Sequence, residues 1–254
     1  MTILNYQQQG TGPDILLIHG LLGSLENLNM VAKGLKEHYR VTSVDVRNHG
    51  HSFHQNSMEY SELAQDIITL LDHLAIKQCA MLGHSMGGKI AMQVALSFPE
   101  RVSKLIIADI APVQYPNHHQ QILAGLQAIN LAGITNRKDA DTQLADYVET
   151  PSVRQFLLRN LTTNNGEWQF KCNLNNISLC YPQIMASYQG QAQYSQPTLF
   201  IKGGNSDYIL PEHREKIVSL FPASKAKIIQ GAGHWLHAEK TNAFNKIVLD
   251  FLTP

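Results

Sequence analysis

A serine at the centre of the pentapeptide GHSMG, residues 83–87, has the setting of a catalytic nucleophile. Residues 78–82 before it are apolar enough for a buried strand, and residues 88–96 after it carry the apolar stripe of a helix. A G-x-S-x-G sequence between strand and helix predicts a nucleophile elbow, a strained turn that lifts the serine hydroxyl above the sheet. Glycines fit the tightest part of the turn because they lack Cβ atoms. Ser85 is therefore the predicted nucleophile.

A serine hydroxyl becomes a good nucleophile when an adjacent base takes its proton. The predicted base is His234, which lies in the glycine-rich sequence GAGHW at 231–235. It follows an expected strand at 227–229, so it should occupy a loop at the carboxyl edge of a sheet. His84 adjoins the nucleophile, but the elbow should point it away and give it a structural role. His237 is a weaker alternative base.

The residues alone leave two candidates for the acid that orients this base. In folds with a nucleophile elbow the order along the chain is serine, acid, histidine. Asp109 ends an apolar run, and Asp207 lies in the segment KGGNSDYILP at 202–211. Counted from the second glycine of that segment, Asp207 fits the pattern G-x-x-D-x-x-x-P. Counted from the first glycine, the place of the acid falls to Ser206.

An acyl-transfer intermediate also needs donors for its oxyanion, which backbone N–H groups can supply. The N–H of Met86, directly after the nucleophile, is one expected donor. The second should come from the loop HGLLGS at 19–24, and we expect it to be the N–H of Leu21. The same glycine-rich loop could cradle a phosphate, but it has neither G-x-G-x-x-G nor Walker spacing. Nucleotide binding is therefore not expected.

Short apolar runs alternate with segments of helical periodicity along most of the chain. The runs that predict buried strands are 15–18, 41–46, 79–82, 105–108, 198–201 and 227–229. The segments that predict helices are 25–37, 60–74, 88–98, 211–221 and 242–251. This alternation is typical of an α/β fold with a doubly wound, mostly parallel sheet.

Residues 112–196 break this rhythm, since they contain no convincing buried strand and are rich in Gln and Asn. The stretch is too long for a plain loop. Helical segments are expected at 120–130, 141–149 and 152–162. We therefore predict a core of residues 1–111 and 197–254, with 112–196 as a helical cap, or lid, over the carboxyl ends of the strands. The alternative is a surface excursion without a role at the site.

The overall composition excludes several functions. The chain has 254 residues, 20 Lys and Arg against 20 Asp and Glu, and a formal net charge of zero. This balance predicts neither a nucleic-acid partner nor an anionic membrane surface. The N-terminal sequence lacks the features of a secretory signal, and no apolar run is long enough to span a bilayer. We expect a soluble, cytoplasmic protein of undetermined oligomeric state.

Cysteine and histidine usage predicts no metal site. The three cysteines, Cys79, Cys172 and Cys180, have no C-x-x-C spacing. Such a set favours neither a disulfide framework nor a zinc site. Among the 12 histidines, the adjacent pair His118 and His119 is the best candidate for a pair of metal ligands. Neighbouring residues on a helix do not face one another, so these two are expected to be solvated surface residues.

Together these motifs resemble the α/β-hydrolases, and within them the small bacterial esterases. The segments that carry the resemblance are 19–24, 45–52, 83–88, 109–113, 203–206 and 231–235. The resemblance implies a helical cap over a rather small pocket, and it implies Asp109 as the acid, with Ser206 in its hydrogen-bond network. The chain departs from the esterase pattern by carrying Asp207 after that serine, which keeps Asp207 as an alternative acid. The resemblance also implies that Arg47 braces loops without touching substrate.

The expected function is that of a serine hydrolase. The resemblance implies that it cleaves acyl esters, and acyl-CoA thioesters as a further substrate class, through an acyl-enzyme and without a cofactor. The alternatives on the same fold are a cofactor-free perhydrolase and a carbon–carbon bond hydrolase. A ligand-binding receptor without turnover is the alternative from another class. The sequence fixes neither the acyl chain nor the alcohol.

Overall fold

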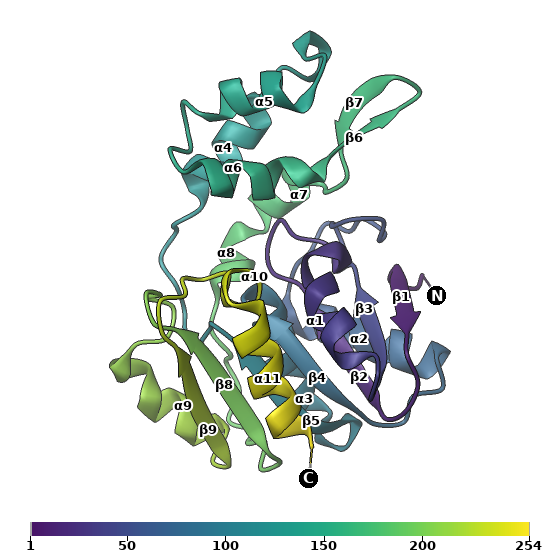
Figure 1. The fold of residues 1–254 in the computed structure, drawn as a ribbon, viewed down its shortest axis with the longest axis vertical. Coiled ribbons are helices and arrows are strands. Elements are labelled where there is room, and N and C mark those ends of the chain that lie inside the picture. Colours follow the sequence, from purple (N-terminus) through teal and green to yellow (C-terminus); the bar gives the residue numbers. More distant parts are fainter. Residues whose placement is uncertain (1, 254) are drawn as a thin grey trace.

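A seven-stranded sheet forms the centre of the molecule (Figure 1). The computed structural model describes residues 2–253. The strands lie in the order β1-β3-β2-β4-β5-β8-β9, and all neighbours are parallel except β1, which pairs antiparallel with β3. Their bounds are β1 Tyr6–Gln9, β2 Asp14–Ile18, β3 Arg40–Val44, β4 Cys79–His84, β5 Val102–Ala108, β8 Thr198–Gly203 and β9 Ser224–Ile229.

Helices cover both faces of this sheet because successive strand residues point to opposite sides. In β2, Ile15 and Leu17 belong to the core under α1 and α11, whereas Leu16 and Ile18 belong to the core under α2, α3 and α9. The helices are α1 Asn29–Leu35, α2 Tyr60–His73, α3 Met86–Ser97, α9 Arg214–Leu220 and α11 Thr241–Leu252. Strands that are buried on both faces explain the continuous apolar runs in the sequence.

The chain direction across the sheet reverses between β2 and β4. From β2 the chain crosses to β3 on one side, and β4 then pairs with β2 on the other side. Loops after such neighbouring strands diverge, and the resulting crevice is where open α/β sheets bind ligands. The loop after β2 begins at His19, and the elbow after β4 contains Ser85. The topology therefore brings two predicted parts of the site together.

Between β5 and β8 the chain forms a separate layer, drawn at the top of Figure 1. We call residues 112–196 the cap segment. Its elements are α4 Gln120–Ala128, α5 Arg137–Leu144, α6 Pro151–Leu157, β6 Leu161–Asn164, β7 Glu167–Phe170, α7 Leu174–Leu179 and α8 Tyr181–Met185. Its last helix is tied to the core, since Tyr60 Oη donates to the Ile184 carbonyl at 2.6 Å and Met58 N–H donates to Gln183 at 2.8 Å.

Several elements differ from the sequence-based expectation. The edge strand β1 and the hairpin β6–β7 were not predicted, because these strands of four residues each are largely polar and mostly exposed or only partly buried, so they give no apolar run. The helix expected at 141–149 begins earlier, at Arg137, since the Asn136 side chain accepts hydrogen bonds from two N–H groups of its first turn. The helix expected at 152–162 ends at Leu157 and gives way to β6.

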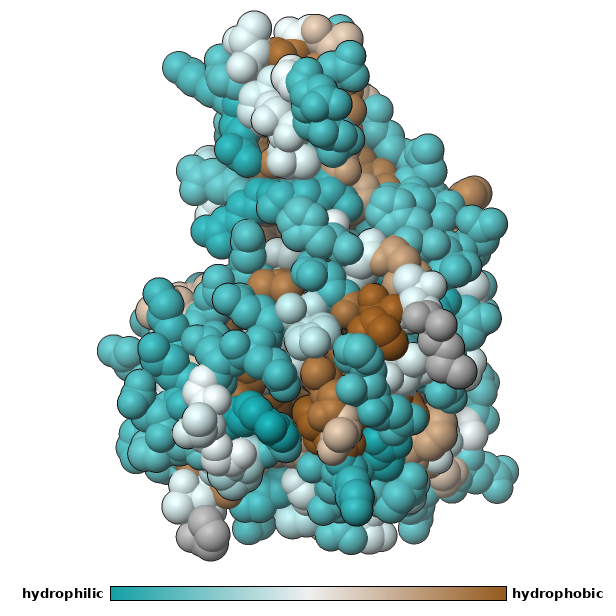
Figure 2. All heavy atoms as spheres, turned by 90° about the vertical axis from the view of Figure 1, so that its right-hand side faces the viewer, coloured by the Kyte–Doolittle hydropathy of each residue, from teal (hydrophilic) through white to brown (hydrophobic). Residues whose placement is uncertain are grey.

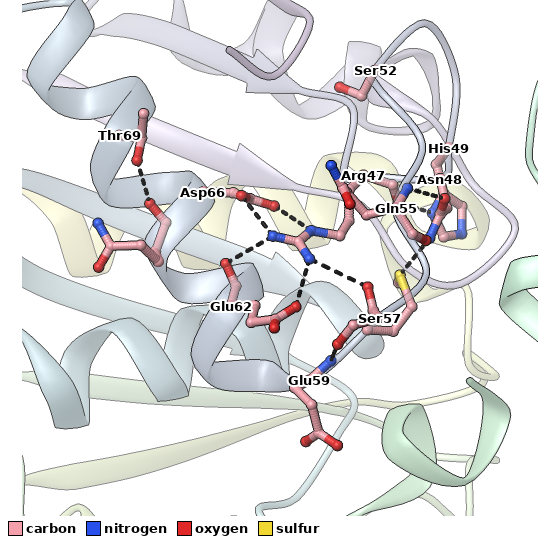
Figure 3. Close-up of polar contacts among 12 residues, drawn as sticks. Arg47, Asn48, His49, Ser52, Gln55, Ser57, Glu59, Glu62, Asp66 and Thr69 are labelled. Atoms are coloured by element: carbon pink, nitrogen blue, oxygen red, sulfur yellow. Dashed lines mark hydrogen bonds and ion pairs between the residues drawn. The ribbon is translucent and has the colours of Figure 1, made fainter. Parts of the chain in front are cut away.

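The segment after β3 is held by charged side chains (Figure 3). Arg47 forms ion pairs with Asp66 at 2.6 Å and Glu62 at 2.7 Å, both on α2, and donates to the Ser57 carbonyl. Asp45 accepts from the N–H groups of Leu25 and His51. The arginine thus braces one loop against a helix, in line with a structural role.

Hydrophilic side chains predominate on the side of the molecule shown in Figure 2, and hydrophobic ones gather there in separate patches. Within residues 2–253, none of the helices combines the length and the apolar character needed to cross a bilayer.

Candidate active site

Ser85 occupies a strained position between β4 and α3. Its backbone angles are φ 53° and ψ −121°, a region that non-glycine residues rarely adopt. A Cβ atom at Gly83 would overlap the Gly87 carbonyl, and one at Gly87 would overlap the Ile18 carbonyl. Only glycine therefore fits at both positions, as the elbow pattern predicts. The strained turn presents the half-buried Ser85 side chain to a cavity.

His234 lies in the loop between β9 and α10 (Leu236–Glu239), beside the serine. Its Nε2 is 3.0 Å from Ser85 Oγ, and its Nδ1 is 2.8 Å from Asp109 Oδ2. His84 supports this loop, since its Nε2 donates a hydrogen bond to the His234 carbonyl at 2.8 Å. His84 is buried and burial holds its pKa well below the usual value, so it stays neutral. It therefore supports the backbone of His234, as expected for a structural residue.

Asp109 follows the last residue of β5 and is completely buried. Besides His234, it accepts hydrogen bonds from the Gly203 N–H at 2.9 Å and from the hydroxyl of Ser206. Asp207 is exposed, and within residues 2–253 its carboxylate makes no hydrogen bond to His234. Of the two aspartates, Asp109 is the one in contact with the imidazole.

Two backbone N–H groups beside Ser85 are available as donors. Among residues 2–253, neither the N–H of Leu21 nor that of Met86 has a hydrogen-bond partner. Leu21 lies on a loop that passes close to the elbow, since a Cβ atom at Gly20 would lie 3.2 Å from Ser85 Cβ. Met86 is the first residue of α3, where the N–H groups have no partner within the helix.

A cavity of about 230 Å³ opens beside Ser85, between the core and the cap segment. The core contributes His19, Gly20, Leu21, Leu22, Gly23, Asn27, Leu28, His84, Ser85, Tyr208, His234, Trp235 and His237. The cap segment contributes His119, Ile122, Val153, Phe156 and Leu157. The walls are mostly apolar, with polar groups gathered near the serine, which is the usual composition of a small-molecule site.

Comparison with known proteins establishes the family. The family model described as alpha/beta hydrolase fold matches residues 13–241. This chain belongs to the α/β-hydrolase fold family. The match confirms the predicted fold class.

Esterases and lipases are among the most similar relatives of this α/β-hydrolase. The chain is 39% identical to the mouse sn-1-specific diacylglycerol lipase ABHD11, over 95% of this chain and 81% of the relative. It is 36% identical to the esterase YbfF of Escherichia coli, over 97% of this chain and 95% of the relative. A solved structure named marine microorganism esterase has 35% identity and a TM-score of 0.96, and the match covers 99% of this chain and all of that one.

Two aromatic residues at the site were not predicted from the sequence. Tyr208, between β8 and α9, stacks on the His234 ring, with ring centroids 3.8 Å apart and an angle of 18° between the planes. His119 was expected on the surface together with His118, but its partly buried ring lines the cavity. Nothing in the sequence distinguishes His119 from the exposed His118, because the path of the cap segment decides which of the two faces inward.

Lys89, in the first turn of α3, is a further buried polar residue. Its Nζ donates to the carbonyls of Met185 at 3.1 Å and Ala186 at 2.7 Å, and lies 4.9 Å from the centre of the Tyr115 ring. Burial lowers the pKa of this amine to about 7. Lys89 thus links α3 to the end of α8.

Residues 2–253 contain no group of three or more His, Cys, Asp or Glu side chains placed to hold a metal ion. The three cysteines within this range are buried and unpaired. Burial raises the pKa of Cys79 and Cys172 to about 12, so both are unreactive thiols at neutral pH.

Proposed function

We propose that this protein is a serine esterase in which Ser85, His234 and Asp109 form the catalytic triad. The observation that carries the proposal is the hydrogen-bonded chain from Ser85 Oγ through His234 to Asp109, which opens into the cavity. The similarity to proteins named esterase and lipase supports ester hydrolysis as the reaction. Ser206 supports the acid through its hydroxyl.

In the proposed mechanism, Ser85 Oγ attacks the ester carbonyl carbon while His234 Nε2 takes the hydroxyl proton. The carbonyl oxygen becomes an oxyanion and is stabilised by the N–H groups of Leu21 and Met86. His234 then gives the proton to the leaving alkoxide, the carbon–oxygen bond breaks and the alcohol departs. Water attacks the acyl-enzyme by the same route and releases the carboxylic acid. Asp109 holds the imidazole with its proton on Nδ1 throughout.

The volume and the mostly apolar lining of the cavity favour a small ester with an apolar group as substrate. Its apolar residues come from both the core and the cap segment, so we propose that residues 112–196 act as the lid over Ser85. Attack of Ser85 on a thioester would give the same acyl-enzyme and release a thiol, so we include thioesters in the proposed substrate range. A cytoplasmic location is part of the proposal as well, and the three unpaired cysteines fit a reducing compartment.

A fluorophosphonate probe tests this function directly. We expect it to label the folded protein once, on Ser85, and to abolish ester hydrolysis. Ser85→Ala should prevent labelling and lower kcat by about 10⁶-fold, as loss of a triad serine does elsewhere, while its thermal unfolding stays the same. Labelling at another residue, or ester turnover that survives in Ser85→Ala, would falsify the proposal.

A further inference from the structure

The stacked Tyr208 ring covers one face of the His234 imidazole. The two planes are nearly parallel and in van der Waals contact. A stacked ring limits how far the imidazole can tilt or rotate away from Ser85 Oγ. Its π face also attracts the positive charge that the imidazole carries after it has taken the serine proton.

The backbone of Tyr208 is fixed to the network around the acid. Its N–H donates to Ser206 Oγ at 3.3 Å, and the Ser206 hydroxyl donates to Asp109. Its carbonyl accepts a hydrogen bond from the hydroxyl of Tyr115. The ring that stacks on the base is therefore held in part by Ser206, which also donates a hydrogen bond to the acid.

The hydroxyl end of Tyr208 reaches the cap segment. It lies 3.3 Å from His119 Nε2, and His119 Nδ1 lies 2.8 Å from the hydroxyl of Tyr181, which also accepts from the His119 N–H at 2.9 Å. Burial lowers the pKa of His119 to about 4, so this imidazole is neutral at pH 7. A neutral ring can donate at one nitrogen and accept at the other, and it adds no positive charge beside His234.

We propose that Tyr208 is a positioning residue for the His234 imidazole, and that His119 couples this positioning to the cap segment. The inference rests on the proposed function, since it assigns a role in the same acyl transfer. With the cap segment in place, His119 fixes the Tyr208 hydroxyl and the ring lies flat on the base. If the cap segment moves away, Tyr208 loses this contact and the imidazole loses part of its restraint.

Two substitutions at Tyr208 separate the ring from its hydroxyl. Tyr208→Leu removes the stacked ring, and kcat should fall by about 10–100-fold, because misplacement of a catalytic group by about 1 Å can cost that much. Most of the loss in kcat/KM should lie in kcat, and fluorophosphonate labelling of Ser85 should slow in parallel. Tyr208→Phe keeps the ring but removes the contact between its hydroxyl and His119, so kcat should fall by only about 3-fold, the effect of losing a single neutral hydrogen bond.

The contribution of His119 is tested by a double-mutant cycle. If His119 acts through the Tyr208 hydroxyl, the double variant with His119→Leu and Tyr208→Phe should lose no more kcat than His119→Leu alone. Tyr147→Leu is the matched control, because this tyrosine of the cap segment is 36% exposed and does not line the cavity. It should keep both kcat and KM.

The inference is overturned if Tyr208→Leu keeps the kcat of the unmodified protein, or if Tyr208→Phe loses as much as Tyr208→Leu. If the fold-losses in kcat of His119→Leu and Tyr208→Phe multiply in the double variant, the two residues act independently and the link through His119 is refuted. Should Tyr208→Leu fail to fold, Tyr208→Met supplies the same comparison. Ser85→Ala in the same assay keeps the two proposals apart, because its inactivity upholds the esterase function whatever Tyr208 does.

Discussion

Ser85 and Asp109 both have a positive backbone φ, which is uncommon for residues other than glycine. Both have φ 53°, and each follows the last residue of one of two paired strands, His84 of β4 and Ala108 of β5. A positive φ turns the chain sharply, so each side chain is directed toward the loop that carries His234. Aspartate and asparagine tolerate this conformation better than most residues. Asparagine is therefore a suitable replacement for Asp109 in a test of the acid.

Asp109→Asn should lower kcat by about 10⁴-fold, because the amide N–H₂ faces His234 Nδ1 and favours the wrong imidazole tautomer. Asp207→Asn is the matched control and should keep kcat within about 2-fold, because an exposed carboxylate away from the imidazole has little influence on it. Steady-state hydrolysis of a chromogenic ester measures both, and circular dichroism checks folding. A collapse of activity in Asp207→Asn alone would make Asp207 the acid.

Periodicity predicted the parallel strands and the helices of the core because burial on both faces leaves long apolar runs in the sequence. It could not choose between Asp109 and Asp207, since both follow neighbouring strands, β5 and β8, whose carboxyl ends lie side by side. That choice depends on loop conformation, which apolar patterns do not encode. The same holds for His119 and Tyr208, whose contacts join the cap segment to the loop after β8.

At the level of elements, Lys89 joins α3 to the end of α8, and its titration should affect stability. Its pKa is about 7 in the folded protein against about 10.5 for an ordinary lysine. Between these values the unfolded chain binds a proton that the folded chain has lost, so the free energy of unfolding rises with pH. Relative to Lys89→Met, the unmodified protein should gain up to about 1.4 kcal/mol per pH unit from pH 7 upward.

Urea unfolding at pH 7, 8 and 9 measures this difference. The exposed Lys33→Met, on α1, is the control and should differ from the unmodified protein by the same amount at each pH. A constant difference between the unmodified protein and Lys89→Met would show that this amine titrates alike in both states. In that case the hydrogen bonds of Lys89 to Met185 and Ala186 would still join α3 to α8, but they would make no contribution that depends on pH.

For the molecule as a whole, buried histidines should make stability depend on pH. The charged groups balance at a net charge of zero, but burial lowers the pKa of several of the 12 histidines. These are His19, His49, His84, His119 and His237. Four of them, all except His49, line the cavity, so burial favours the neutral form of several side chains around the site. Composition reveals the number of histidines, but only the packing shows which ones are buried.

These histidines predict a steep loss of stability in mild acid. Burial holds their pKa values in the folded protein below the ordinary value of about 6.5. The unfolded chain therefore binds more protons as the pH falls through this value, and the stabilisation present above it is lost. Each contributes at most about 1.4 kcal/mol per pH unit. Within residues 2–253, His237 Nδ1 has no hydrogen-bond partner. His237→Phe should therefore reduce the dependence of the unfolding free energy on pH by up to one proton, whereas substitution of the exposed His118 by Gln should leave it unchanged. Urea midpoints at pH 7.5, 6.5 and 5.5 measure the slopes, and equal slopes in all three proteins would contradict the assignment.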